Sequence, residues 1–329
     1  MTTTDSLDTV VLVLTCLEDI TADLVIKTLH ARGTTVVRLD PTDLGRGVSF
    51  DSVIGGGPHD WDGTLHTPSR KVRLTDIGAV YYRRPSPWSS EHPEPRTAEF
   101  AVTEARHGFG GLLHNLPCAS YVNHPSAVAR ADRKPGQLQT AARVGFDVPP
   151  TLVTNDVEAA RAFAAKHRNV VYKPFRGLPQ TEDGTAGALW AQRVNPSTFD
   201  DSLSVTAHLF QAEVDKIADA RVTVVGDRIF AWLITTTDGF LDWRRADWDE
   251  LSHTPATVPP QITSALRRYL EVYGLTFGCF DFAVTGPAWD RHSWVWLECN
   301  PNGQWGWLPD SDDIAAAFAD SLTTQRKQP

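Results

Sequence analysis

The chain has 329 residues, a formal net charge of -9 and 41% hydrophobic residues. Its length predicts one large domain or two to three small ones, and its composition is that of a globular protein with a substantial core. The acidic balance argues against a general nucleic-acid binder. The polar N-terminus has no signal-peptide core, and the apolar run Val10–Leu14 is far too short to span a membrane.

The four cysteines lie far apart in the sequence. Cys16, Cys118, Cys279 and Cys299 form no CxxC pair. Such spacing is typical of reduced, mostly buried thiols in a cytosolic protein. We therefore expect a cytoplasmic protein without a nucleic-acid or membrane partner.

The first part of the chain alternates strand and helix patterns. Val10–Leu14 is a continuous apolar run, Ile20–Ala31 has apolar residues at helical spacing, and Thr35–Leu39 is the next expected strand. This order predicts a parallel sheet in an α/β unit, followed by a hairpin and a helix from 94 to 114. The first turn, 15–19, has no glycine, so a dinucleotide-binding fingerprint is absent there.

One strand of this unit ends in two arginines. Residues 79–82 are followed by Arg83 and Arg84, before a proline-rich loop. Open α/β sheets bind ligands at the carboxyl ends of their strands, and two guanidinium groups there could hold a carboxylate or a phosphate. A solvated arginine pair would give the same local sequence, so both interpretations stay open at this point.

The middle of the chain carries two lysines and a glycine-rich loop. Lys134 precedes the helical pattern of residues 137–144, and Lys173 lies near the end of the strand pattern 169–174. The loop 176–187 contains three glycines and no apolar periodicity, which predicts a mobile connection between strands. Lysines supply point charges for phosphates, and the backbone amides of such a loop can close over them.

Three further elements follow from local signals. Asp156 is the expected cap of a helix over residues 157–166, and a return strand is expected at 188–194, after the loop. A Gly226-Asp227 turn predicts a hairpin over residues 221–232.

The last part of the chain contains an isolated carboxylate in an apolar strand and a polar strand end. Asp281 lies in the first strand, and the second, residues 294–300, ends in Glu298-Cys299-Asn300. Strand alternation places Glu298 and Asn300 on one face, where a carboxylate and an amide oxygen suit Mg²⁺. A strand that ends in an ordinary turn has the same local pattern. Asp281 on the neighbouring strand favours the metal site.

Taken in order, these pieces resemble an ATP-grasp ligase over residues 120 to 310, with a pre-ATP-grasp unit before it. The matching segments are 123–125 with Lys134, 171–174, 209–211, 219–226, 281–282 and 297–301. Within that superfamily the chain most resembles the ATP-grasp ribosomal peptide maturases, the graspetide or microviridin-type macrocyclases. The segments 82–85 and 300–305 carry this narrower resemblance.

The resemblance implies a mixed α/β (α+β) architecture, the ATP-grasp fold behind a parallel pre-ATP-grasp domain. Residues 1–125 would form the pre-ATP-grasp domain, and residues 126–205 the central domain with the glycine-rich lid loop. Residues 206–329 would form the C-terminal domain with the Mg²⁺-binding strands.

The resemblance also implies a reaction. A carboxylate attacks ATP to give an acyl phosphate, and a hydroxyl or amine then attacks the acyl carbon. In the maturases both groups are side chains of one precursor peptide, which gives ester or amide macrocycles. ATP and Mg²⁺ are the implied cofactors, a leader segment of the precursor docks on the enzyme, and a homodimer is plausible.

The implied site residues fall into four groups. Lys134 and Lys173 would contact the ATP phosphates, and Arg221 the γ-phosphate or acyl phosphate. Asp281, Glu298 and Asn300 would bind Mg²⁺. The hinge beside the adenine and ribose would be Gln211, Ala212, Glu213 and Val214 with Lys216, and the substrate-side candidates are Arg83, Arg84 and Trp305.

Two other functions remain compatible with the sequence. The first is an ATP-grasp ligase that joins two small molecules or adds amino acids, as in glutathione synthetase or the ribosomal-protein glutamate ligase. The second is a non-catalytic ATP-grasp fold that only binds a peptide. The joint presence of the lysines, Arg221 and the three metal candidates argues against this last function.

Overall fold

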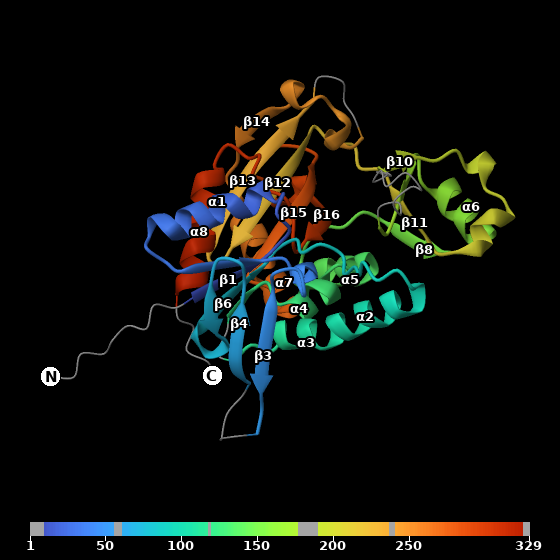
Figure 1. Cartoon of the computed structure of the whole chain (residues 1–329). Coiled ribbons are helices and arrows are strands. Elements are labelled where there is room, and N and C mark those ends of the chain that lie inside the picture. Colours follow the sequence, from blue (N-terminus) through green and yellow to red (C-terminus); the bar gives the residue numbers. More distant parts are fainter. Residues whose placement is uncertain (1–9, 56–60, 118–119, 177–189, 237–240, 325–329) are drawn as a thin grey trace.

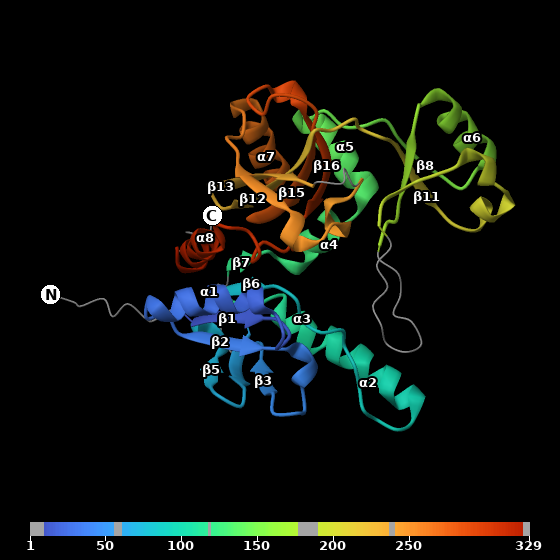
Figure 2. The ribbon, with the colours of Figure 1, turned by 90° about the horizontal axis from the view of Figure 1, so that it is seen from above.

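The computed structural model describes residues 10–55, 61–117, 120–176, 190–236 and 241–324. These residues form four sheets, and the chain is arranged in three units (Figure 1). In Figure 2 the N-terminal unit is at the bottom of the picture, the C-terminal unit is at the top, and the central unit lies to the right. The cysteines that the structure describes, Cys16, Cys279 and Cys299, are free thiols, and Cys118 lies outside the described residues.

The N-terminal unit is built on the predicted parallel sheet. Its strand order is β2-β1-β6-β7, and each neighbouring pair is parallel. Its strands are β1 (Val10–Leu14), β2 (Val36–Leu39), β6 (Ile77–Tyr82) and β7 (Ser120–Val122), and helix α1 (Ile20–Ala31) follows β1. The carboxylate of Asp19 accepts a hydrogen bond from Ala22 N, which explains why α1 begins there.

Two features of this unit differ from the prediction. The expected helix 94–114 is broken at Gly108 into α2 (Pro95–His107) and α3 (Phe109–Leu113). The predicted hairpin, β4 (Asp62–His66) and β5 (Lys71–Arg73), gains a third strand, β3 (Ser49–Val53). The sequence of β3 is too polar to stand out as a strand, because neither face is fully buried.

The central unit is a small antiparallel sheet covered by one helix. Its order is β10-β9-β11-β8, from β8 (Thr151–Thr154), β9 (Val170–Lys173), β10 (Gln192–Arg193) and β11 (His208–Ala212). Helix α6 (Val157–Lys166) begins at its predicted cap, Asp156. The predicted return strand 188–194 is reduced to β10, and the glycine-rich loop lies outside the described residues except for its first residue, Arg176.

The C-terminal unit is a five-stranded antiparallel sheet of order β14-β13-β12-β15-β16. Its strands are β12 (Ala218–Val225), β13 (Arg228–Thr235), β14 (Ser252–Pro255), β15 (Phe277–Val284) and β16 (Trp294–Asn300). Helices α4 (Pro125–Ala131), α5 (Lys134–Val144) and α7 (Pro260–Tyr273) share one core with it, and α8 (Ser311–Thr323) packs on the opposite side. Helix α8 also packs against α1 and so joins this unit to the N-terminal one.

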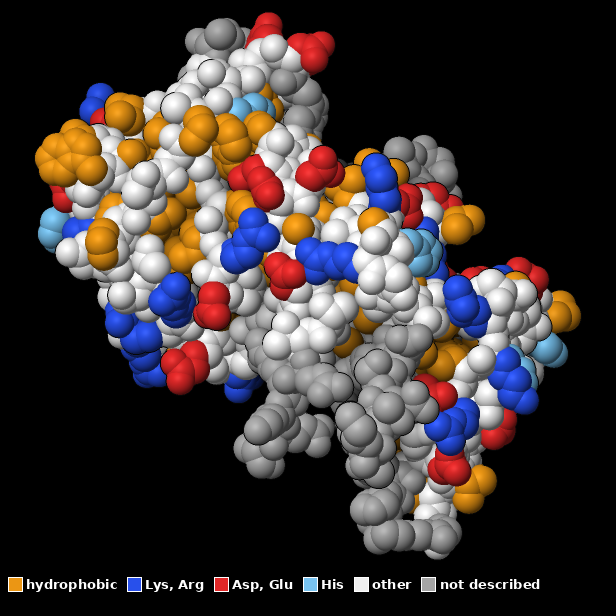
Figure 3. Space-filling model, turned by 90° about the vertical axis from the view of Figure 1, so that its left-hand side faces the viewer, with side chains coloured by type: hydrophobic (Ala, Val, Ile, Leu, Met, Phe, Trp, Pro, Cys, Tyr) orange, Lys and Arg blue, Asp and Glu red, His pale blue; other side chains and the backbone are white. Residues whose placement is uncertain are grey.

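The surface shows charges of both signs side by side on the face drawn in Figure 3, and apolar side chains gather near its upper left. Within the part of the chain that the structure describes, no helix combines the length and the apolar character needed to cross a membrane.

Candidate active site

The site is built on the edge strand β16, and a bulge sets its geometry. Asp281 of β15 pairs with Glu298, but the next residue, Phe282, pairs with Trp296, so Leu297 is the extra residue. Alternation from the buried Trp294 and Trp296 would otherwise turn Glu298 into the core. The bulge re-aims it to the face that also carries Asp281 and Asn300.

The free edge of β16 is held by residues from the segment that precedes the central unit. The side-chain amide of Gln137 donates to Cys299 O at 2.9 Å and accepts from Cys299 N at 3.1 Å. The backbone of Asp147 accepts from Trp296 N at 2.8 Å. These contacts satisfy backbone groups that an edge strand leaves unpaired, and they fix the strand on either side of Glu298.

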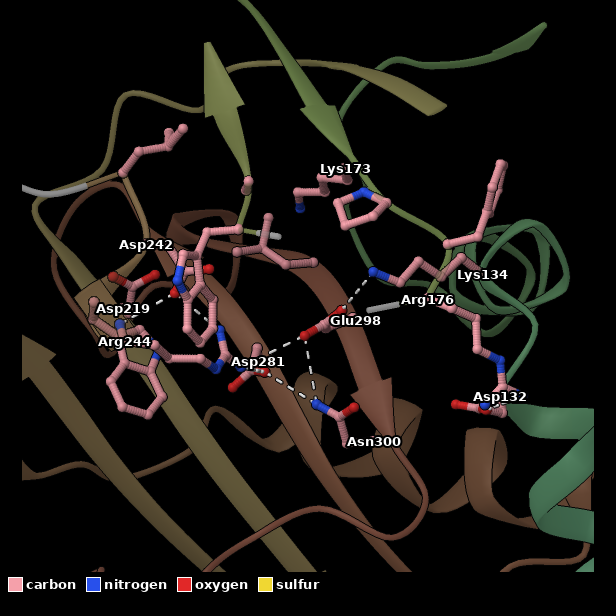
Figure 4. Close-up of a pocket in the computed structure, with 17 residues that line it drawn as sticks. Asp132, Lys134, Lys173, Arg176, Asp219, Asp242, Arg244, Asp281, Glu298 and Asn300 are labelled. Carbon is pink, nitrogen blue, oxygen red and sulfur yellow. Dashed lines mark hydrogen bonds and ion pairs between the residues drawn. The ribbon is translucent and has the colours of Figure 1, made fainter. Parts of the chain in front are cut away.

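Three oxygen-bearing side chains meet on this face. The amide nitrogen of Asn300 lies 3.5 Å from Asp281 Oδ2 and 3.4 Å from Glu298 Oε1 (Figure 4). The structure therefore brings together the three predicted metal ligands from two adjacent strands.

Two arginines hold Asp281. Arg221 Nη1 donates to both of its oxygens at 2.8 and 2.9 Å, and Arg244 Nη2 donates to Oδ2 at 2.7 Å. Arg221 is 4% exposed, and its other amino group donates to Gln304 O. Gly303 allows this approach, because a Cβ there would lie 3.0 Å from Arg221 Nη2 and 2.6 Å from Cys279 Cβ.

The two predicted lysines lie near Glu298, on the side of the cavity opposite the arginines. Lys134 Nζ lies 3.4 Å from Glu298 Oε2, and Lys173 lines the cavity above it (Figure 4). Burial lowers the pKa of Lys173 to about 8, although the charge of Glu298 opposes this shift. Burial by itself would raise the pKa of Glu298, but the surrounding cations, above all Lys134, hold it well below its usual range.

These groups line a cavity of about 390 Å³ between the central and C-terminal units. Its size is within the range of small-molecule sites. Among the predicted residues, Lys134, Lys173, Asp281, Glu298 and Asn300 line it. Arg221 does not line this cavity. It can therefore affect a molecule bound there only through Asp281, which it holds.

The predicted hinge is divided between two neighbouring cavities. Gln211 is 3% exposed, donates to Thr151 Oγ1 and lines a small cavity behind Lys134, Lys173 and Glu298. The hinge residues Glu213, Val214 and Lys216 instead line a cavity of about 200 Å³ that shares Asp219 and Leu241 with the main one. Ala212, the last residue of β11, donates its backbone N–H to Pro150 O.

The side chains of this hinge are already paired. Glu213 bonds Arg193 at 2.6 and 2.7 Å. Lys216 bonds Asp219 at 2.7 and 2.6 Å and also donates to Leu241 O. Burial raises the pKa of Asp219 to about 6 despite that lysine.

Two of the three substrate-side candidates are corrected by the structure. Arg83 has a fully buried side chain that donates to Asn302 O and Gln304 Oε1, each at 2.5 Å. Trp305 is 0% exposed and stacks on Phe318 in the core. Neither side chain reaches a surface that a substrate could touch, because both anchor the turn after β16. Arg84 is exposed, away from the main cavity.

The sequence reasoning missed Arg244 and Asp242, which also line the cavity. Both belong to the segment around the short helical turn η5 (Trp243–Arg245), with Asp242 as its cap. The only sequence signal was an Asp-Trp-Arg-Arg run outside any periodic element.

The donor set fits Mg²⁺ in its chemistry. Among the described residues no group of three or more His, Cys, Asp or Glu side chains could hold a metal. Two carboxylates with one amide oxygen are instead the partial set that suits Mg²⁺ when phosphates and water supply the other ligands. The nearby cationic side chains offset the negative charge of the carboxylates. An Mg²⁺ ion would therefore bind here only together with phosphates, which add negative charge.

Comparisons with known proteins agree with the fold. A model of the MvdD pre-ATP grasp domain matches residues 10–129. The chain is similar to a RiPP-associated ATP-grasp ligase of Chryseobacterium gregarium, solved with ADP and a leader and core peptide. Their identity is 27% over 97% of this chain and 98% of that one, with a TM-score of 0.86.

Two macrocyclases of Microcystis aeruginosa are also similar. MdnC, solved with the precursor peptide MdnA, is 26% identical over 95% of this chain and 99% of its own, with a TM-score of 0.82. MdnB is 27% identical over the same shares, with a TM-score of 0.77. None of the curated proteins matches this chain significantly.

The fold and these comparisons confirm the resemblance to ATP-grasp ligases with a pre-ATP-grasp domain that was found in the sequence. Within this superfamily the chain is similar to ATP-grasp ligases and macrocyclases of ribosomally made peptides.

Proposed function

We propose that the protein is an ADP-forming ligase that closes side-chain ester or amide rings in a ribosomally made precursor peptide. The observation that carries this proposal is the single face on which Asp281, Glu298 and Asn300 meet Lys134 and Lys173. It lies on a fold that matches a RiPP-associated ligase over 97% of the chain.

Each group has a distinct task in this proposal. Lys134 and Lys173 bind the phosphates of ATP as point charges. Asp281, Glu298 and Asn300 hold Mg²⁺, which supplies charge neutralisation at the phosphates when bound. Arg221 acts as a positioning residue, because it holds Asp281 and the turn at Gln304 without reaching the cavity.

The peptide is the acyl donor and the nucleophile. The carboxylate of an acidic side chain takes up the γ-phosphoryl group, and ADP leaves. A hydroxyl or amine of the same peptide then forms the ester or amide bond, phosphate leaves, and the nucleophile gives up its proton. A leader segment of the precursor is the proposed partner, and the cytoplasm, where ATP and reduced thiols coexist, is the proposed location.

The packing of the core supports a revised division of the chain. Ala131, Ala141, Val144 and Phe146 share the C-terminal core with Phe280. We therefore assign α4, α5 and the residues up to about 150 to the C-terminal unit. The central unit then begins at β8 and ends with β11.

The proposed homodimer has a suitable surface on α2. None of its residues is buried, and Ala98, Val102 and Ala105 form the half-buried side. The opposite side carries Arg96, Phe100 and Glu104 at intervals of four residues, with Phe100 65% exposed. In an antiparallel pair related by a two-fold axis at Phe100, each Arg96 faces the other copy's Glu104.

Phe100→Glu tests this surface, with Val205→Glu as a control at an 83% exposed position of the central unit. Sedimentation should show that the first variant is monomeric and the second unchanged. A Phe100→Glu protein that sediments as the wild type does would exclude α2 as the interface.

The proposed function is tested with a short Thr-, Asp- and Glu-rich peptide encoded beside the gene. Incubation with ATP and Mg²⁺ should release ADP and give a peptide that is lighter by one water per crosslink. A product heavier by a second molecule would indicate a small-molecule or amino-acid ligase. The absence of ADP release with every candidate would favour the non-catalytic peptide binder.

A further inference from the structure

Arg244 occupies the space between the proposed metal ligands. Its Nη2 atom lies 2.7 Å from Asp281 Oδ2 and 3.5 Å from Glu298 Oε1. The guanidinium group therefore bridges the two carboxylates that face each other across β15 and β16 (Figure 4). The charges of these carboxylates raise the pKa of Arg244, although burial opposes this effect.

This contact and a bound Mg²⁺ exclude each other. An ion coordinated by Asp281 and Glu298 needs their lone pairs at about 2.0–2.1 Å. Asp281 Oδ2 already accepts hydrogen bonds from Arg221 Nη1 and Arg244 Nη2, so an ion at this oxygen has to displace Arg244. Two cations at that separation would also repel each other strongly. Arg221 does not compete in this way, because it approaches Asp281 from the buried side beside Gly303.

We infer that Arg244 is an internal placeholder cation, which neutralises the metal-site carboxylates until a metal–nucleotide complex displaces it. This inference rests on the proposed function, because it takes Asp281 and Glu298 as metal ligands. It makes Arg244 a positioning residue that sets how tightly the site binds metal.

The structure also supplies a place for the displaced guanidinium. Arg244 Nη1 lies 3.1 Å from Asp242 Oδ1, and the same oxygen accepts the backbone N–H of Arg244. The guanidinium lies over the ring of Trp243, with Cζ 4.7 Å from its centroid. Arg244 can therefore leave the carboxylates by turning its Nη2 side away while it keeps Asp242.

The consequence is a measurable competition. Couplings between two sites of this kind amount to roughly 5–150-fold in affinity. Removing the competing cation should strengthen metal binding by about tenfold or more at constant nucleotide. Without metal, replacing Arg244 leaves Asp281 and Glu298 with less neutralising charge. Adding metal should therefore raise the thermal stability of such a variant more than that of the wild type.

The test compares Arg244→Gln with Arg245→Gln, an exposed arginine of the same short helix. Mn²⁺ is titrated into each protein preloaded with ADP, and the heat is corrected with an enzyme-free ADP titration. Arg244→Gln should bind Mn²⁺ about tenfold more tightly, and Arg245→Gln should match the wild type. An affinity of Arg244→Gln equal to or weaker than that of the wild type would overturn the inference.

Two further variants keep the test decisive. Glu298→Gln should lose Mn²⁺ binding, and if it binds as the wild type does, the metal assignment within the proposed function fails instead. Arg244→Met, which removes the charge but keeps a long side chain, covers the case in which Arg244→Gln does not fold. Its affinity should exceed that of the wild type, and an unchanged value would contradict the placeholder role.

Discussion

Replacing Arg83 by methionine should unfold the junction between the N-terminal and C-terminal units. The side chain has no exposed surface, and its Nε lies 3.5 Å from Oδ2 of Asp19, whose side chain is 1% exposed. Its amino groups donate to Asn302 and Gln304 in the turn that follows β16. Methionine keeps much of the volume but removes every one of these contacts.

The magnitude follows from the charge that is left behind. Removing one partner of a buried ion pair costs about 3–5 kcal/mol, because the other charge stays buried and uncompensated. Asp19 would be that charge, and its remaining bonds from Thr15 and Ala22 do not neutralise it. We therefore expect the free energy of unfolding to fall by about 3–5 kcal/mol.

Urea unfolding followed by circular dichroism measures this loss, with Arg84→Met as the matched control. Arg84 is exposed and makes no ion pair with any residue that the structure describes, so its replacement should change the stability by less than about 0.5 kcal/mol. Adding Asp19→Asn to Arg83→Met should restore part of the loss, because the unpaired charge is gone. A loss below about 1 kcal/mol for Arg83→Met would refute the reasoning, since no buried pair would then have been broken.

Three further predictions concern single residues. Lys173, whose pKa falls from 10.5 to about 8, binds fewer protons in the folded than in the unfolded chain between those values. Stability should therefore rise with pH across that window, and ATP affinity should weaken above about pH 8 in the wild type but not in Lys173→Met. Glu298→Gln should abolish ADP release while the circular dichroism spectrum stays unchanged, and retained turnover would contradict the metal assignment. Trp305→Ala should cost about 3–5 kcal/mol in thermal unfolding, whereas Trp289→Ala, at an 81% exposed position, should cost almost nothing.

The elements that the sequence predicted well are those with one dominant local signal. The apolar run of β1, the cap of α6 at Asp156 and the Gly226-Asp227 turn between β12 and β13 each fix a boundary without help from distant residues. That Asp281 lies beside Glu298 and Asn300 was also predicted from the sequence, because a carboxylate in an apolar strand needs a partner.

The bulge at Leu297 could not be predicted, although the site depends on it. Strict alternation from Trp294 would have placed Glu298 in the core, and only the pairing with β15 shows the extra residue. The sequence interpretation succeeded there because it counted from Glu298 to Asn300, beyond the bulge.

The contacts of Arg83 and Arg244 could not be predicted from the sequence. A pair of arginines at a strand end has the same local pattern whether it binds a ligand or a distant turn, and the partners of Arg83 lie about 220 residues away in the sequence. Arg244 lies outside any periodic element, so only the folded chain reveals that it faces Asp281. Long-range hydrogen bonds and ion pairs of this kind leave no periodic signal.

The most direct test of the account is the mass of the proposed precursor peptide after incubation with the enzyme, ATP and Mg²⁺. The account predicts a product lighter by one water for each crosslink, with one ADP released per ring. A peptide of unchanged mass, or one that gains the mass of a second molecule, would contradict the assignment as a peptide macrocyclase.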